Sequence, residues 1–152
     1  MKHIATVVVL ATVFVLGIVP KARANECSNA TLQGSFGYTS TGILLDSYVP
    51  PPFAGPFAEV GRQTFDGKGH TEATATLSAN GNIQQVTIQG TYKVNADCTG
   101  SMTLYVLQFQ STVHADFVID RDGAELRAIG TDSGVIESRV YRKQFQEDLE
   151  KE

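Results

Sequence analysis

The stretch from residue 84 to residue 109 most constrains the fold, because it predicts two strands joined by a tight turn. Apolar and polar side chains alternate before the turn at residues 95–100, and they alternate again after it. The apolar positions are Val86, Ile88, Tyr92 and Val94, then Met102, Leu104 and Val106. A period of two is typical of half-buried strands. We therefore expect an antiparallel hairpin that contributes one face to a core.

Similar runs, each ending at a Gly-, Asn- or Asp-containing turn, predict the other strands. They span residues 34–43, 57–65, 70–79, 111–120, 125–131 and 135–144. Asn80-Gly81 is the strongest of the hairpin signals. No stretch before Tyr141 has a helical period, so the chain is expected to be all-β with eight strands.

Eight strands paired in sequence order would leave two open edges unless the last strand met the first. We therefore predict an eight-stranded antiparallel up-and-down barrel, whose interior is either filled or has room for one small ligand. A two-sheet β-sandwich is the alternative. The short hairpin connections favour the barrel.

The N-terminus predicts a signal peptide over residues 1–24. Lys2 and His3 precede an apolar run of about 16 residues, shorter than the roughly 20 that a membrane-spanning helix needs, and Ala22-Arg23-Ala24 is typical of a cleavage site. We expect cleavage near Ala24, export to a periplasm or to the extracellular space, and no stable membrane anchor. Residues 25–145 then form a single barrel domain, and residues 146–152 form a charged C-terminal tail.

Charge argues against nucleic acid as a partner. Cleavage would remove Lys2, Lys21 and Arg23, leaving nine basic residues against sixteen acidic ones, so that the net charge falls from −4 to −7. Such a surface repels phosphate backbones, and no basic cluster with interleaved aromatic residues offsets it. The sequence leaves the oligomeric state open.

The two cysteines, Cys27 and Cys98, predict a disulfide, because thiols of an exported chain meet oxidising conditions. Their separation is far from that of a C-x-x-C redox site. The bond would tie the start of the mature chain to the turn of the central hairpin.

Three segments carry a resemblance to a known family. CSNATLQGSFGY at residues 27–38, GRQTFDGKG at residues 61–69 and GTYKVNADCTGS at residues 90–101 resemble small exported bacterial proteins of the allene-oxide-cyclase-like, lipocalin-like barrel type. The resemblance covers most of the mature chain. It implies an eight-stranded barrel with a cysteine pair. Most of the proteins of this type have no assigned function. None of the catalytic residues of the plant cyclases or of the bacterial polyketide cyclases matches a position here, and a shared fold does not transfer an activity.

Aromatic and apolar residues on the expected inner face, together with a proline-rich connection, predict a ligand pocket. The connection, residues 44–56, holds four of the five prolines and several apolar residues, so it forms either a rim over a cavity mouth or a loop packed on the core. Small residues between the aromatic ones leave room inside, although a filled core explains them equally well. The candidate ligand-binding residues are Phe36, Tyr38, Tyr48, Phe53, Glu59, Tyr92, Leu104 and Phe117.

Charged residues inside predicted strands are the only candidates for acid–base chemistry. They are Glu59, Arg62, His114, Asp116, Glu137 and Arg139. Most of them are expected on the outside of the barrel. Glu59 alternates with Phe57 and Phe65, and would have a raised pKa if it faced the interior. No catalytic residue is assigned, and no metal site and no cofactor are expected, because no motif for covalent, metal or phosphate chemistry occurs.

Three functions remain open. The first is an exported protein that binds a small apolar or amphipathic ligand inside the barrel. The second is a cofactor-independent cyclase or isomerase, although the sequence leans away from an enzyme. The third is a structural or interaction protein with a filled core. An apolar cavity would favour the first function, and a cavity with an oriented acidic or basic group the second.

Overall fold

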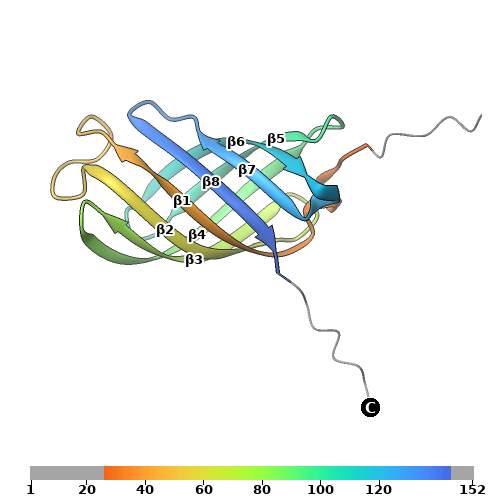
Figure 1. Ribbon diagram of the computed structural model, residues 1–152, viewed down its shortest axis with the longest axis horizontal. Helices are drawn as coiled ribbons and strands as arrows, with labels where there is room; N and C mark the ends of the chain where they lie inside the picture. Colours follow the sequence, from red (N-terminus) through yellow and green to blue (C-terminus); the bar gives the residue numbers. More distant parts are fainter. Residues whose placement is uncertain (1–25, 145–152) are drawn as a thin grey trace, which may run out of the picture.

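The computed structural model describes residues 26–144, which form a closed barrel of eight antiparallel strands (Figure 1). Each strand pairs with its neighbours in sequence, and the last pairs with the first, Tyr38 lying opposite Tyr141. The strands are β1 (Gly34–Leu44), β2 (Gly55–Phe65), β3 (His70–Ala79), β4 (Asn82–Val94), β5 (Thr99–Val106), β6 (Ser111–Asp120), β7 (Glu125–Gly130) and β8 (Val135–Lys143). The predicted barrel is confirmed, and the sandwich is excluded.

The predicted strands differ from the observed ones mainly at their ends. The central hairpin was expected to run to Phe109, but β5 ends at Val106 and the chain turns over residues 107–110, with Gln110 at a positive φ of 50°. β2 begins two residues earlier than expected, at Gly55. Asn80 and Gly81, both with positive φ, form the predicted tight turn between β3 and β4.

The apolar residues that alternate along the strands form the inner face of the barrel, as the sequence predicts. In the central hairpin Val86, Ile88, Tyr92, Met102 and Leu104 are all buried. The polar residues between them point outward, because successive side chains of a strand lie on opposite faces of the sheet. Every strand presents apolar side chains to the interior, and the burial of these side chains is the main stabilising contribution to the barrel.

One end of the barrel is closed by a short plug that the sequence did not predict. The single-turn 3₁₀ helix η1 (Asn29–Leu32) lies across this end, where Leu32 is fully buried. The Asn29 side-chain oxygen accepts a hydrogen bond from the Val94 N–H at 2.8 Å, and the Tyr92 hydroxyl donates to the Asn29 carbonyl at 3.1 Å. The polar lead-in to the first strand therefore becomes the floor of the barrel. A second 3₁₀ turn, η2 (Arg121–Gly123), joins β6 to β7 at the same end.

The predicted disulfide joins this plug to the barrel. Cys27, just before η1, bonds to Cys98 in the turn between β4 and β5, and the Cys27 N–H donates to the Ala96 carbonyl at 3.2 Å. The bond links residues 71 positions apart.

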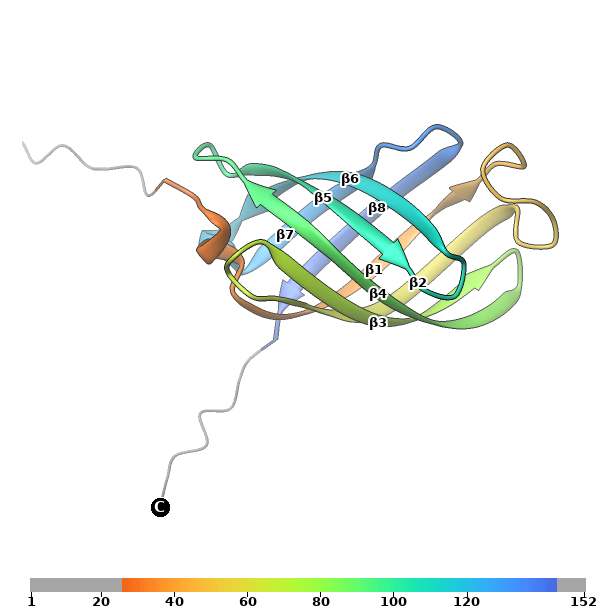
Figure 2. The same cartoon turned by 180° about the vertical axis from the view of Figure 1, so that it is seen from behind.

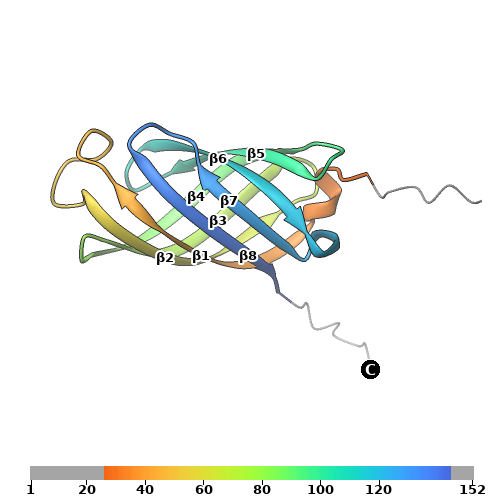
Figure 3. The same cartoon turned by 45° about the horizontal axis from the view of Figure 1, so that its top comes forward.

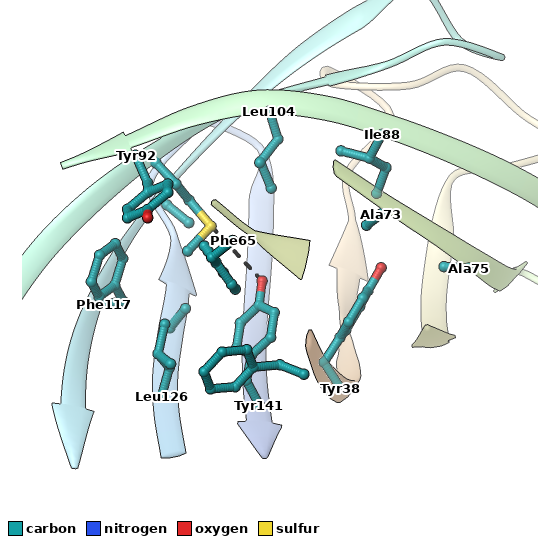
Figure 4. Close-up of a cluster of buried hydrophobic side chains, with 14 of the residues drawn as sticks. Tyr38, Phe65, Ala73, Ala75, Ile88, Tyr92, Leu104, Phe117, Leu126 and Tyr141 are labelled. Atoms are coloured by element: carbon teal, nitrogen blue, oxygen red, sulfur yellow. Dashed lines mark hydrogen bonds between the residues drawn. The ribbon is translucent and has the colours of Figure 1, made fainter. Parts of the chain in front are cut away.

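The half of the barrel next to the plug is filled by large side chains (Figure 4). Phe65 packs edge to face against Phe36 and Tyr92, with ring centroids 5.4 and 5.1 Å apart. Leu126 and Phe117 close the remaining space, and both are buried. This half matches the filled-core alternative.

The opposite end carries the longest connection, between β1 and β2, together with the turns between β3 and β4, β5 and β6, and β7 and β8 (Figures 2 and 3). The predicted proline-rich connection forms a loop over residues 45–54. Its Pro52 carbonyl accepts hydrogen bonds from the side-chain amides of Asn80 and Asn82, at 3.2 and 3.0 Å, and the Leu45 N–H donates to the Gly134 carbonyl at 2.9 Å. These bonds tie the loop to the neighbouring turns of the same end.

The predicted signal peptide and the whole charged tail, residues 146–152, fall outside residues 26–144, so the structure does not describe them. Within that range, no helix is long and apolar enough to cross a bilayer.

Candidate ligand-binding cavity

A cavity of about 470 Å³ occupies the loop-bearing half of the barrel and is partly open to solvent. Its walls are mostly apolar, and its volume falls in the range of small-molecule sites. The apolar wall residues are Leu44, Val49, Phe53, Phe57, Leu77, Ala79, Val86, Ile88, Val106, Phe109, Val113 and Val135. The barrel is therefore filled at one end and hollow at the other.

The eight candidate ligand-binding residues divide between these two halves. Tyr48, Phe53 and Glu59 line the cavity. Tyr38 lies one layer deeper and contacts Glu59. The other four belong to the filled half: Phe36, Tyr92, Leu104 and Phe117. Sequence alternation places all four on the inner face, but it does not say at which height along the barrel the core stops.

The cavity floor is polar, and Glu59 is its most accessible carboxylate. Glu59 lies on β2, half-buried and facing inward, and it accepts a hydrogen bond from the buried hydroxyl of Tyr38. Gly61 leaves room for the Tyr38 ring, because a Cβ at that position would lie 2.8 Å from the ring and 2.6 Å from the Ala75 Cβ.

Beside Glu59, a buried ion pair on β8 forms the rest of the floor. Arg139 and Glu137 are 6% and 8% exposed, and the Arg139 Nε donates to a Glu137 carboxylate oxygen at 2.9 Å. The same oxygen accepts from the Ser40 hydroxyl at 2.6 Å. The guanidinium also lies over the Tyr38 ring, 5.1 Å from its centroid. A buried charge pair with several hydrogen bonds is held in one geometry.

A chain of hydrogen bonds continues from this pair into the filled half. Arg139 donates to the Tyr141 hydroxyl at 3.1 Å, and Tyr141 donates to Gln63 at 3.1 Å. Gln63 in turn donates to Thr71 at 2.9 Å. The Tyr141 hydroxyl also lies 3.8 Å from the Met102 sulfur, the contact dashed in Figure 4. The network separates the cavity from the aromatic core.

Burial shifts the titration of the floor residues. Desolvation raises the pKa of Glu59, although the Arg139 charge and the Tyr38 hydrogen bond oppose it. Desolvation, aided by the neighbouring Glu59 charge, raises the pKa of Tyr38, so that this phenol stays protonated. Arg139 stays charged: burial alone would lower its pKa, but the surrounding acidic groups outweigh burial and raise it.

Tyr48, from the loop over the cavity, adds a further polar group. Its hydroxyl oxygen is buried and has no hydrogen-bond partner among residues 26–144. Desolvation raises its pKa, as do the charges of Asp132 and Glu137. A buried hydroxyl without a partner is destabilising, and a bound molecule could supply the missing hydrogen bond.

The other charged candidates lie elsewhere. Arg62, His114 and Asp116 are exposed on the outer surface. His114 Nδ1 lies 2.7 Å from an Asp132 carboxylate oxygen there. Glu137 and Arg139, expected outside with them, instead face inward. Within the described part of the chain, no group of three or more His, Cys, Asp or Glu side chains could hold a metal ion.

Two other hollows lie on the outer wall. One, of about 610 Å³, runs over β5, β6 and β7, and the other, of about 560 Å³, over β1, β2 and β8. Both are more open than the cavity, and exposed residues such as Asp116, Arg127 and Arg142 line them. They are surface depressions, so the interior cavity is the better candidate site.

Comparison with protein-family models and with curated sequences finds no match. Three solved structures are similar in fold. A redesigned β-barrel, b11L5F_LGL, superposes with a TM-score of 0.55 at 14% identity, covering 77% of this chain and 95% of its own. A redesigned β-barrel, mFAP1, bound to DFHBI, gives a TM-score of 0.53 at 13% identity, covering 76% and 97%. EF1p2_mFAP2b bound to DFHBI gives a TM-score of 0.54 at 10% identity, covering 75% of this chain and 94% of its own.

At these identities the likeness shows the fold alone. It supports the expected resemblance as far as a small, lipocalin-like barrel. Nothing in the comparisons supports the allene-oxide-cyclase-like family or a bacterial origin.

Proposed function

We propose that this protein binds a small amphipathic molecule in the open half of its barrel. The observation that carries the proposal is the cavity itself: an apolar wall around a space of about 470 Å³ that ends on a polar floor. An apolar body would be buried against the wall, while one polar group would reach the floor.

The similar barrels agree with this proposal. Two of them, mFAP1 and EF1p2_mFAP2b, are described as bound to DFHBI. A protein of similar fold can therefore bind a small ligand, which supports the binding proposal here.

A second candidate function is acid–base catalysis without a cofactor. Glu59 is its specific support, because it is a half-buried carboxylate with a raised pKa that is held by a tyrosine. Binding is the better supported function, because the other titratable groups that line the cavity, among residues 26–144, are Tyr48 and the Glu137–Arg139 pair, and that pair is already engaged in its own hydrogen bonds.

We further propose that the protein works after export, in a periplasm or outside the cell. The disulfide between Cys27 and Cys98 supports an oxidising compartment. Signal-peptide cleavage near Ala24 remains a prediction, and the N-terminal residue of the protein purified from its own host would test it.

Titration with N-phenyl-1-naphthylamine, a neutral apolar probe that fluoresces when it leaves water, tests the binding proposal. We expect saturable binding with one site per chain. Val113→Trp, which fills the cavity, should abolish binding, whereas Thr91→Trp, on the outer face of β4, should not. No saturable binding by the folded protein, or equal loss in both variants, would overturn the proposal.

A further inference from the structure

The charges on the cavity floor do not cancel, and the remaining net charge favours amphipathic ligands of the opposite charge. Two carboxylates, Glu59 and Glu137, face one guanidinium, Arg139. Arg139 is engaged by Glu137 through its Nε and one terminal nitrogen, and by the Tyr141 hydroxyl through the other. With both carboxylates ionised, the floor carries one uncompensated negative charge.

Glu59 bears that charge. Among residues 26–144, Glu59 takes part in no ion pair, and Tyr38 is its one side-chain hydrogen-bond partner. The groups that face it are Tyr38 on β1 and the pair Glu137 and Arg139 on β8. Its register partners on β1 and β3, Ser40 and Leu77, are uncharged. Glu59 therefore faces the one guanidinium that Glu137 already engages, and it forms no ion pair of its own among residues 26–144.

We propose, building on the binding function above, that the preferred ligand is a compact apolar amine whose ammonium group pairs with Glu59. The carboxylate is already positioned and partly desolvated by folding, so the ligand meets a preorganised partner. Tyr48 also lines the cavity, and its hydroxyl, which has no hydrogen-bond partner among residues 26–144, can accept a hydrogen bond from a bound ligand. An anionic ligand would add a second uncompensated negative charge.

Displacement of N-phenyl-1-naphthylamine by three ligands with the same chain tests this at pH 7: octylamine, octanol and octanoate. We expect octylamine to bind about tenfold more tightly than octanol, because a charge-assisted hydrogen bond is roughly twice as strong as a neutral one. Octanoate should bind most weakly. The preference for the amine should decrease as the pH falls and Glu59 becomes protonated.

The variant Glu59→Gln should reduce the ratio of amine to alcohol affinity from about ten to about one. Glu72→Gln, exposed on the outer face of β3, is the matched control and should keep the ratio. If octanol or octanoate binds as well as octylamine, or if Glu59→Gln keeps the ratio, the amine proposal is wrong while the binding function stands. If neither the probe nor any of the three ligands binds, the binding function itself fails.

Discussion

The rings of Phe53 and Phe109 meet edge to face at the mouth of the cavity, with their centroids 5.7 Å apart and their planes at 65°. Phe53 belongs to the loop between β1 and β2, and Phe109 to the turn between β5 and β6. Both rings line the cavity, so this contact between two distant loops narrows its entrance. A ligand that leaves the cavity has to separate them or pass beside them.

Phe109→Ala should therefore speed the release of a bound probe. An aromatic pair of this kind contributes about 0.5–1.5 kcal/mol, so the dissociation rate of N-phenyl-1-naphthylamine should rise roughly two- to tenfold. Stopped-flow dilution measures this rate. Tyr105→Ala, which removes an exposed ring from the outer face of β5, is the control and should leave it unchanged. An unchanged rate in both Phe109→Ala and Phe53→Ala would show that the pair does not limit release.

Breaking the buried ion pair should destabilise the barrel. Arg139→Met leaves Glu137 buried without its cation, and the loss of one partner of such a pair lowers the free energy of unfolding by about 3–5 kcal/mol. Urea denaturation measures this free energy of unfolding. The double variant Glu137→Leu/Arg139→Met should lose less than the sum of the two single variants, because neither member of the pair is then left without the other.

An exposed pair provides the control for this experiment. The Arg127 guanidinium and the Asp120 carboxylate lie 2.7 Å apart on the outer surface, and Arg127→Ala should lower the free energy of unfolding far less than Arg139→Met does, because solvent screens an exposed pair. Equal effects of Arg139→Met and Arg127→Ala would contradict the assignment of a structural role to the interior pair.

The alternation of apolar and polar residues predicts the barrel and its inner face. Which inward side chains meet at the same level along the barrel axis depends on the register between neighbouring strands. On β8, Ile136 and Val140 alternate with Glu137 and Arg139, so the apolar residues suggest the opposite orientation to the observed one. Ile136 is in fact 59% exposed. The charged residues can face inward because β1 places the small residues Gly42 and Ser40 directly opposite them. No local pattern within β8 reveals those partners.

The plug and the boundary of the cavity could not be predicted from the sequence for a similar reason. η1 has only four residues, too few for a periodic signal, and its position depends on long-range hydrogen bonds to Tyr92 and Val94. The boundary between filled and hollow halves depends on which large side chains meet across the barrel. Turn chemistry is local, by contrast, and so the sequence predicts the hairpins, including the one at Asn80-Gly81.

The stability of the protein should depend on pH through Glu59. Burial raises its pKa above the 4.5 of an ordinary glutamate, so the folded state holds the proton more tightly than the unfolded chain. This contribution is fully present below pH 4.5 and is lost as the pH rises through the folded-state pKa. Glu59→Gln cannot titrate, so its stability relative to the wild type should increase between pH 4 and pH 8. Urea midpoints at several pH values, with Glu72→Gln as the control, measure the difference, and a constant difference would contradict a raised pKa.

Loss of the disulfide should destabilise the closed end. Cys98→Ser opens a loop of about 70 residues, and the chain-entropy model gives a decrease of about 4 kcal/mol in the free energy of unfolding. Cys27→Ser should have the same effect, because either change removes the same bond. Wild type treated with reductant should unfold at the same urea concentration as the two variants. If the oxidised wild type and Cys98→Ser unfolded at the same concentration, the hydrogen bonds of Asn29 and the packing of Leu32 would hold the plug without help from the disulfide.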